Sequence, residues 1–196
     1  LVDTQGRNWR FYLVDDDEVN AFAVPGGYIY VNKGLVARAK TMSQLAGVVG
    51  HEIAHVTQRH SVEQMEKGQR IGIGATLACI AQPQFCRAGG GDLLNLGATA
   101  IMAKFSRNDE SEADRFGLQY IVRAGIDPNG MPEMFEILLA ERKARGGDGG
   151  GGFLASHPME EDRIAATRRM IAELPEAQRT GTRDTEAFRR FKARLA

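Results

Sequence analysis

The chain has 196 residues, enough for one domain with a substantial buried core. Its 25 basic and 25 acidic residues balance, so charge gives no reason to expect binding to nucleic acid or to an anionic membrane. No stretch reaches the roughly 18 consecutive apolar residues of a membrane-spanning helix, so we expect no transmembrane segment.

The first thirty residues favour β structure. The stretches NWRFYLV (8–14) and YIYV (28–31) are rich in aromatic and β-branched residues, which predicts two short strands. Gly26 and Gly27 lead into the second strand. We therefore expect a small sheet at the N-terminal end of the domain.

A long amphipathic helix is predicted over residues 41–67, because apolar residues recur there at helical spacing. Gly47 and Gly50 lie inside it, where each costs about 1 kcal/mol relative to alanine. We expect another element to approach the helix closely at these glycines, just before the motif HEIAH.

The rest of the chain is predicted to be mainly helical. Helices are expected over 92–124, ended by a glycine, over 131–144, and from Pro158 to just before Pro175. The glycine-rich run at 146–152 is expected to be a mobile loop. The pattern predicts an α+β, mostly α fold with a single domain over 1–196.

Two cysteines, Cys79 and Cys86, stand six residues apart on either side of a proline turn. They would close a small disulfide loop in an oxidising compartment, or they would be two ordinary buried thiols. Both readings stay open.

The motif HEIAH at 51–55 indicates a metal site. On a helix, His51 and His55 project within about 40° of each other and one turn apart, with Glu52 beside them. Two imidazoles in this arrangement occupy neighbouring zinc positions, and the glutamate reaches a water on the metal. The sequence therefore predicts a zinc ion held in part by these two histidines.

His60 does not fit as a third ligand, because on a continuous helix it would lie about 180° away from His51. We expect it at the surface or at a helix end. The acidic stretch SRNDESEADRFG offers another donor, since Arg107, Glu110 and Asp114 share one helix face. Either Glu110 binds the zinc while Asp114 orients a ligand histidine, or Arg107 and Glu110 form an ordinary surface pair.

Four segments, in order, are shared with a known family: NAFAVPGGYIYVNKGL, HEIAH, SRNDESEADRFG and SHPMEEDRI, within residues 20–164. The chain resembles the zinc metallopeptidases that include HtpX and the CAAX prenyl endopeptidases, and is most similar to their soluble periplasmic branch, typified by BepA. The resemblance implies an HExxH zincin of gluzincin-like type, with its small sheet packed on the active-site helix. It also implies one Zn²⁺ per chain, held by His51, His55 and Glu110.

The function that follows is a zinc metalloendopeptidase. Three protein ligands leave one position for a zinc-activated water, and Glu52 would act as the general base for its attack on a peptide carbonyl. We expect extended or misfolded polypeptides as substrates. The alternatives are a chaperone-like or binding module that keeps the zinc with little turnover, and a hydrolase of non-peptide amides. The resemblance implies outer-membrane or periplasmic protein substrates and a soluble periplasmic, or otherwise extracytoplasmic, protein.

Substrate binding is predicted at the strand GGYIYV, through Gly26, Gly27, Tyr28, Ile29 and Tyr30. An exposed edge there would bind an extended peptide by adding it to the sheet as a further strand. The alternative is an internal strand of the small sheet.

His157 precedes Pro158, which suits the first position of a helix, so His157 is predicted to cap that helix with a neutral ring. The resemblance places this His-Pro segment beside the active site. There His157 would stabilise the transition-state oxygen or occupy the open zinc position as a self-inhibiting fourth ligand, and we favour the inhibitory role.

Overall fold

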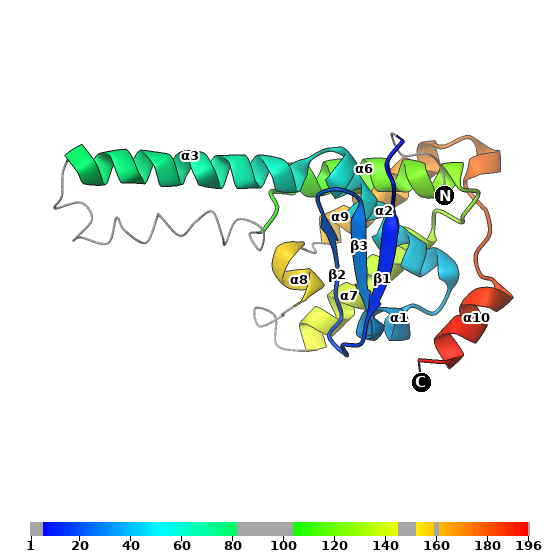
Figure 1. The fold of residues 1–196 in the computed structure, drawn as a ribbon. Helices are drawn as coiled ribbons and strands as arrows, with labels where there is room; N and C mark the ends of the chain where they lie inside the picture. The colour runs from blue at the N-terminus through cyan, green and yellow to red at the C-terminus, as the bar shows by residue number, and fades with distance from the viewer. Residues whose placement is uncertain (1–5, 82–103, 145–151, 159–160, 196) are drawn as a thin grey trace. The chain divides into compact units, whose positions relative to one another are not determined.

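The computed structural model divides into two compact units, residues Leu1–Gln58 with Phe105–Ala196, and residues Arg59–Lys104. The second unit contains the helix α3 (His60–Ala81) (Figure 1). The residues described are 6–81, 104–144, 152–158 and 161–195.

Two predictions fall largely outside these residues. The glycine-rich loop at 146–152 is described only at Gly152, and Cys86, the predicted partner of Cys79, is not described. The mobile loop and the disulfide therefore stay predictions, as does the single-domain assignment. Within the described residues, no helix combines the length and the apolar character needed to span a bilayer.

A three-stranded sheet lies in the first unit, with strands β1 (Arg10–Val14), β2 (Ala21–Val24) and β3 (Tyr28–Asn32) (Figure 1). Its order is β1-β3-β2, with β3 parallel to β1 and antiparallel to β2. The strand at 28–32 is thus central, and its backbone is paired on both sides. The prediction of a substrate-binding edge at Tyr28, Ile29 and Tyr30 is wrong, because no free edge exists there.

The two glycines before β3 serve the turn that joins β2 to β3. Gly26 and Gly27 have φ angles of 105° and 93°, a conformation that residues with a Cβ rarely adopt. A Cβ at Gly27 would also lie 3.0 Å from the carbonyl oxygen of Asn8. Their conformation is required by the turn, and the predicted role in substrate approach is not supported.

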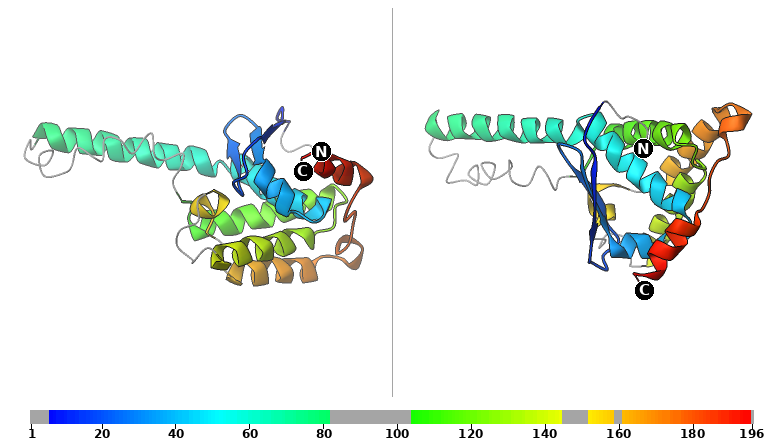
Figure 2. Two further views of the ribbon diagram at one scale, coloured as in Figure 1. Left: turned by 90° about the horizontal axis from the view of Figure 1, so that it is seen from below. Right: turned by 45° about the vertical axis from the view of Figure 1, so that its right-hand side comes forward.

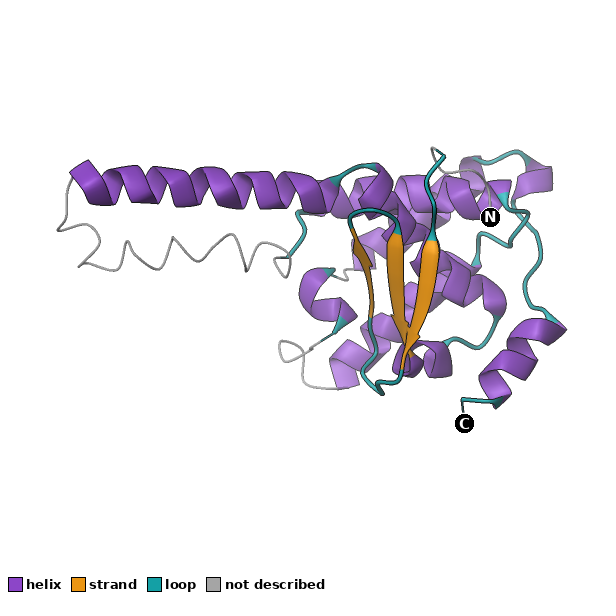
Figure 3. Ribbon diagram, in the orientation of Figure 1, coloured by secondary structure: helices purple, strands orange, loops and turns teal. Residues whose placement is uncertain are grey.

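Helices make up most of the first unit, which confirms the prediction of a mostly α fold with a small sheet (Figure 3). The helical elements are α1 (Lys33–Arg38), α2 (Met42–Thr57), α6 (Arg107–Arg123), α7 (Gly130–Ala144), α8 (Phe153–Ser156), α9 (Glu161–Glu173), the 3-10 turn η3 (Glu176–Gln178) and α10 (Glu186–Ala193).

Two predicted helices are shorter than expected. The helix predicted over 41–67 is interrupted after Thr57, where Arg59 adopts a left-handed φ of 64°, and α3 begins at His60. Residues 104–106 are not helical, because Ser106 caps α6: its hydroxyl accepts from the Asp109 N–H, and the Asp109 carboxylate accepts from the Ser106 N–H. The end of α6 at Arg123 lies where the sequence predicts it.

Helix α2 lies between the sheet and a layer formed by α6, α7 and α9, which run side by side (Figure 2). The inner face of the sheet and these helices enclose one hydrophobic core. Its fully buried members include Ile29, Leu35, Met134, Phe135 and Leu138.

Helices α2 and α6 approach each other closely where they cross at Gly50 and Gly117. A Cβ on Gly117 would lie 2.8 Å from the backbone nitrogen of His51 and 2.9 Å from the carbonyl carbon of Gly50. Gly47 meets α7 in the same way, with 2.6 Å from its Cβ position to the Cα of Met131. The expected close approach at Gly47 and Gly50 is confirmed.

We predict that Gly117→Ala destabilises the protein by about 1–3 kcal/mol, because the new methyl group must push two backbones apart and this outweighs the gain in helix propensity. Denaturant unfolding would measure the change. Gln119→Ala, at an exposed position of the same helix, should stay within about 0.5 kcal/mol of wild type. Equal stability of the Gly117 and Gln119 variants would contradict a tight crossing.

Candidate metal centre

Four buried side chains point their donor atoms at one another in the first unit. His51 and His55 come from successive turns of α2, Glu110 comes from the first turn of α6, and His157 follows α8. One donor atom of each lies within 4.8 Å of the donors of the other three, and each side chain is at most 1% exposed. The structure thus brings together the three residues predicted as zinc ligands and His157, which the family resemblance places beside them.

The spacing of these donors suits a small cation. His51 Nε2 lies 2.9 Å from His55 Nε2 and 3.2 Å from His157 Nδ1. The carboxylate of Glu110 lies 2.9 Å from His157 Nδ1, 3.4 Å from His55 Nε2 and 3.5 Å from His51 Nε2. Donors around a tetrahedral zinc with bonds of about 2.0–2.1 Å stand about 3.3 Å apart, and imidazole nitrogen with carboxylate oxygen is a usual zinc donor set. The residues present therefore fit the metal.

Asp114, one turn beyond Glu110 on α6, orients the first histidine. Its Oδ1 lies 2.8 Å from His51 Nδ1, so the ring donates from Nδ1 and turns its Nε2 to the donor cluster. The sequence predicts this contact through the helix spacing of Glu110 and Asp114. A carboxylate behind a ligand histidine fixes its tautomer and increases its basicity.

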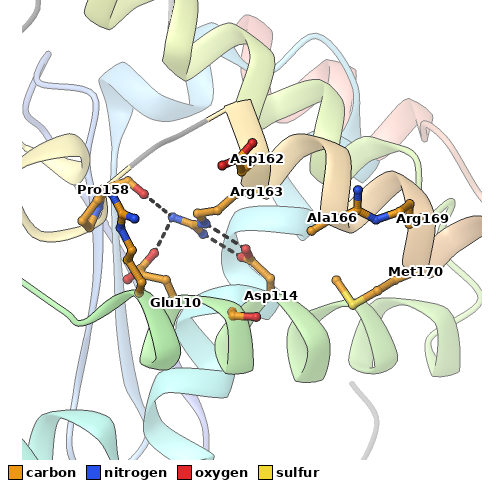
Figure 4. Close-up of a pocket in the computed structure, with 10 residues that line it drawn as sticks. Glu110, Asp114, Pro158, Asp162, Arg163, Ala166, Arg169 and Met170 are labelled. Carbon is orange, nitrogen blue, oxygen red and sulfur yellow. Dashed lines mark hydrogen bonds and ion pairs between the residues drawn. The ribbon is translucent and has the colours of Figure 1, made fainter.

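Arg163, on α9, is a member of the site that the sequence analysis missed. It forms a double hydrogen bond with Asp114 at 2.8 and 2.6 Å, an ion pair with Glu110, and a 2.8 Å bond to the carbonyl of Pro158 (Figure 4). Its guanidinium also lies 4.9 Å from the ring centre of Phe135. A basic residue six positions after His157 in SHPMEEDRI was the signal that could have found it.

A pocket of about 260 Å³ lies between α6 and α9 behind these contacts (Figure 4). Glu110, Asp114 and Arg163 form its inner wall, and Arg107 is one of its exposed lining residues. The side chain that bridges Glu110 and Asp114 is Arg163. Arg107 was predicted only to share a helix face with these two residues.

Glu52 lies beside the donor cluster and is 2% exposed. Its Oε1 is 3.4 Å from His157 Nε2, and no hydrogen bond reaches that oxygen from the side chains and backbone that the structure describes. The backbone N–H of Ala23, in β2, lies near the carboxylate and acts to lower its pKa, against burial. Burial raises the pKa of Glu52 above its ordinary value, which favours a group that can take up a proton.

The protein environment sets the charges of the donors in opposite directions. Burial holds the pKa of His55 well below its usual value, so its ring is neutral and can bind a metal. Burial alone would raise the pKa of Glu110, but the neighbouring imidazoles of His157 and His51 lower it well below its usual range. The result is an ionised carboxylate among imidazole nitrogens.

The prediction that His157 is the N-terminal cap of a helix starting at Pro158 is wrong. His157 is the C-terminal cap of α8, and Pro158 is not helical. Burial lowers the pKa of His157, but the carboxylates of Glu52 and Glu110 outweigh burial and raise it, which is opposite to the predicted dipole effect. The ring is stacked on Phe153 with centroids 4.3 Å apart.

His60 does not belong to the donor cluster found among the described residues. It is the first residue of α3, so of the two predicted positions the helix end is confirmed, and its side chain is buried at 3% exposure. The helix is interrupted between His51 and His60, so the two residues do not lie on one continuous helix.

Comparison with known proteins agrees with this geometry. Residues 2–171 match the profile of Peptidase family M48. The beta-barrel assembly-enhancing protease of Escherichia coli K12 is 39% identical over 167 residues, which cover 82% of this chain and 34% of that protein. The mitochondrial metalloendopeptidase OMA1 of Schizosaccharomyces pombe is 34% identical over 179 residues, covering 87% and 48%. The metalloprotease YcaL of Escherichia coli K12 is 33% identical over 172 residues, covering 84% and 62%.

The chain spans about a third of the length of the first of these relatives. The family match covers most of the chain and includes all four residues of the donor cluster together with Glu52. The chain therefore belongs to peptidase family M48.

Proposed function

We propose that this domain is a zinc-dependent endopeptidase in which His51, His55 and Glu110 hold one Zn²⁺ and Glu52 is the general base. The observation that carries the proposal is the convergence of buried donors at tetrahedral spacing next to a carboxylate oxygen without a hydrogen bond. Neither a structural zinc site nor an ordinary ion-pair network needs that carboxylate.

The chemistry divides between the metal and the chain. Zinc, when bound, would polarise the substrate carbonyl and lower the pKa of a water molecule. Glu52 takes the proton from the attacking water and returns it to the leaving amine, which its raised pKa suits. Asp114 and Arg163 hold His51 and Glu110 in orientation.

The substrate would lie along β2, which is one of the two edge strands of the sheet and the one that contacts α2. Asn32 N–H donates to the Asn20 carbonyl, so the alternating pattern turns the N–H and C=O of Ala21 and Ala23 away from β3. The nearness of the Ala23 N–H to the Glu52 carboxylate supports placing this edge beside the general base. An extended peptide added to β2 therefore passes next to the reacting groups.

His157 would act as a self-inhibiting fourth ligand. With its Nδ1 among the donors, four protein groups surround the metal position and leave no site for water. Substrate hydrolysis then requires His157 to withdraw, which separates a closed resting state from an open active one.

The natural substrates and the compartment are also proposals. The relatives named beta-barrel assembly-enhancing protease support outer-membrane or periplasmic proteins as substrates, and a periplasmic or other extracytoplasmic location. Binding at an edge strand depends mainly on main-chain hydrogen bonds to an extended peptide, and this supports unfolded or misfolded segments as the substrate class.

We predict that the domain cleaves denatured casein, that a chelator abolishes cleavage, and that added Zn²⁺ restores it. Glu52→Gln should keep the zinc and the fold but lose about 10²–10⁴ in rate, because only the proton acceptor is removed. Cleavage, zinc content and circular dichroism would be measured together. Zinc retention with no cleavage by the wild type would favour the binding-module alternative, and near-normal cleavage by Glu52→Gln would exclude the mechanism.

We predict that Glu110→Gln lowers bound zinc strongly, because an amide is a poorer ligand than a carboxylate. Glu112→Gln is the matched control: it makes the same change two residues along α6, at a side chain that is 42% exposed and pairs with Arg115. Zinc per chain would be measured after dialysis against a limiting zinc buffer. Equal zinc loss in the two variants would contradict the assignment.

We predict that His157→Ala raises kcat/KM roughly tenfold or more, as expected when the open state is populated at about 10% or less. Zinc content should be retained, since three ligands remain. Ser156→Ala, at the neighbouring position, should behave as wild type. A fall in activity with zinc retained would assign His157 to transition-state stabilisation instead.

A further inference from the structure

The outer face of the sheet carries a row of stacked aromatic rings that the proposed mechanism does not use. Tyr12, Tyr30 and Phe22 lie side by side on β1, β3 and β2, because the register pairs Tyr12 with Tyr30 and Phe22 with Tyr30. Their ring centroids are 5.1 and 5.0 Å apart, with interplanar angles of 17° and 12°. The ring spacing follows the spacing of neighbouring strands, about 4.8 Å.

This aromatic row ends at Phe22 on the β2 edge of the sheet. Phe22 is 41% exposed, and β2 is one of the two edge strands of the sheet formed by the described residues. Tyr30 covers one face of the Phe22 ring. A strand that paired with β2 would place a side chain about one strand spacing beyond Phe22, where it could stack on the other face of the Phe22 ring.

In an antiparallel strand added to β2, the residue opposite Phe22 would lie at a position where paired side chains are close together. The backbone groups of Phe22 point to Tyr30, since Asn20 and Asn32 form a hydrogen-bonded pair and the pattern alternates. Toward an added antiparallel strand, Phe22 is therefore in a non-hydrogen-bonded pair, where the side chains of opposing residues approach most closely. Aromatic pairs across strands stabilise such contacts.

Phe22 also lies close to the proposed general base. Helix α2, which carries Glu52, contacts β2, and the backbone N–H of Ala23, the neighbour of Phe22, lies near the Glu52 carboxylate. Because side chains alternate along a strand, the substrate residue opposite Ala23 would face inward and the residue opposite Phe22 would face outward. The residue opposite Phe22 would thus be the immediate neighbour of the residue that lies nearest Glu52.

We propose that Phe22 forms a specificity subsite that selects an aromatic side chain at one fixed, outward-facing position of an extended substrate, which continues the row Tyr12–Tyr30–Phe22. The inference rests on the proposed endopeptidase function with β2 as the substrate strand. The enzyme would then prefer extended segments that carry an aromatic residue at this outward-facing position over extended segments without one.

The test uses a set of extended peptides that differ only in the place of a single phenylalanine, scanned through the positions around the cleaved bond against an all-alanine reference. Wild type should prefer phenylalanine at one outward position by about threefold to fivefold in kcat/KM. Phe22→Ala should reduce this ratio to about one, and Phe22→Tyr should restore it. Tyr12→Ala, at the far end of the row and 43% exposed, should keep the preference.

Two results would overturn the subsite: a positional preference that survives Phe22→Ala, or equal losses on the aromatic and alanine peptides, which would mean that Phe22 only stabilises the sheet. Binding of the same peptides to the Glu52→Gln protein, measured by fluorescence anisotropy, separates this proposal from the proposed function. If wild type cleaves nothing but binding still prefers the aromatic peptide in a Phe22-dependent way, the endopeptidase function fails and the subsite stands. If binding shows no such preference, the subsite fails whatever the cleavage result.

Discussion

The site depends on the close crossing of α2 and α6 at Gly50 and Gly117. With no side chain at either position, the two backbones approach within a distance that a single methyl group would disturb. His51 follows Gly50 directly, and Glu110 lies two turns before Gly117 on the partner helix. The crossing therefore sets the separation between the histidine pair and the carboxylate. A cation held by these donors tolerates little change in that separation, because metal–ligand bond lengths vary by only about 0.2 Å.

Around this crossing, the charges form a layered arrangement. The inner layer is the ionised Glu110 among imidazoles, and the outer layer is Asp114 between His51 and Arg163. Burial alone would raise the pKa of Asp114, but the guanidinium of Arg163 lowers it, so the carboxylate stays ionised behind the histidine. Since Arg163 also bonds the carbonyl of Pro158, the same side chain links the metal donors to the segment that carries His157. This one guanidinium therefore contacts both Glu110 and the residue next to His157.

The sheet lies beside this centre. Its inner face packs on α2, and the backbone N–H of Ala23 in β2 lies near Glu52. The pairing of β3 with both β1 and β2 makes the strand after the glycine turn central and leaves β1 and β2 at the two edges. The edge strand that contacts α2 therefore comes from NAFAV, rather than from YIYV.

The sequence alone determined the local parts of the site. Helical spacing placed His51, Glu52 and His55 together, and it placed Glu110 and Asp114 on one face, because a helix has the same geometry wherever it forms. The costly glycines Gly47 and Gly50 likewise indicated a close neighbour.

Only the tertiary structure decided contacts between elements far apart in the chain. These are the contacts of Arg163 with Asp114 and Glu110, the contact of His157 with Glu110, and the strand order that makes β3 central. Strand order and side-chain contacts between elements depend on how the elements pack. One pattern of apolar and polar residues is compatible with several packing arrangements. Local periodicity therefore predicts which residues share a face, whereas packing determines what that face meets.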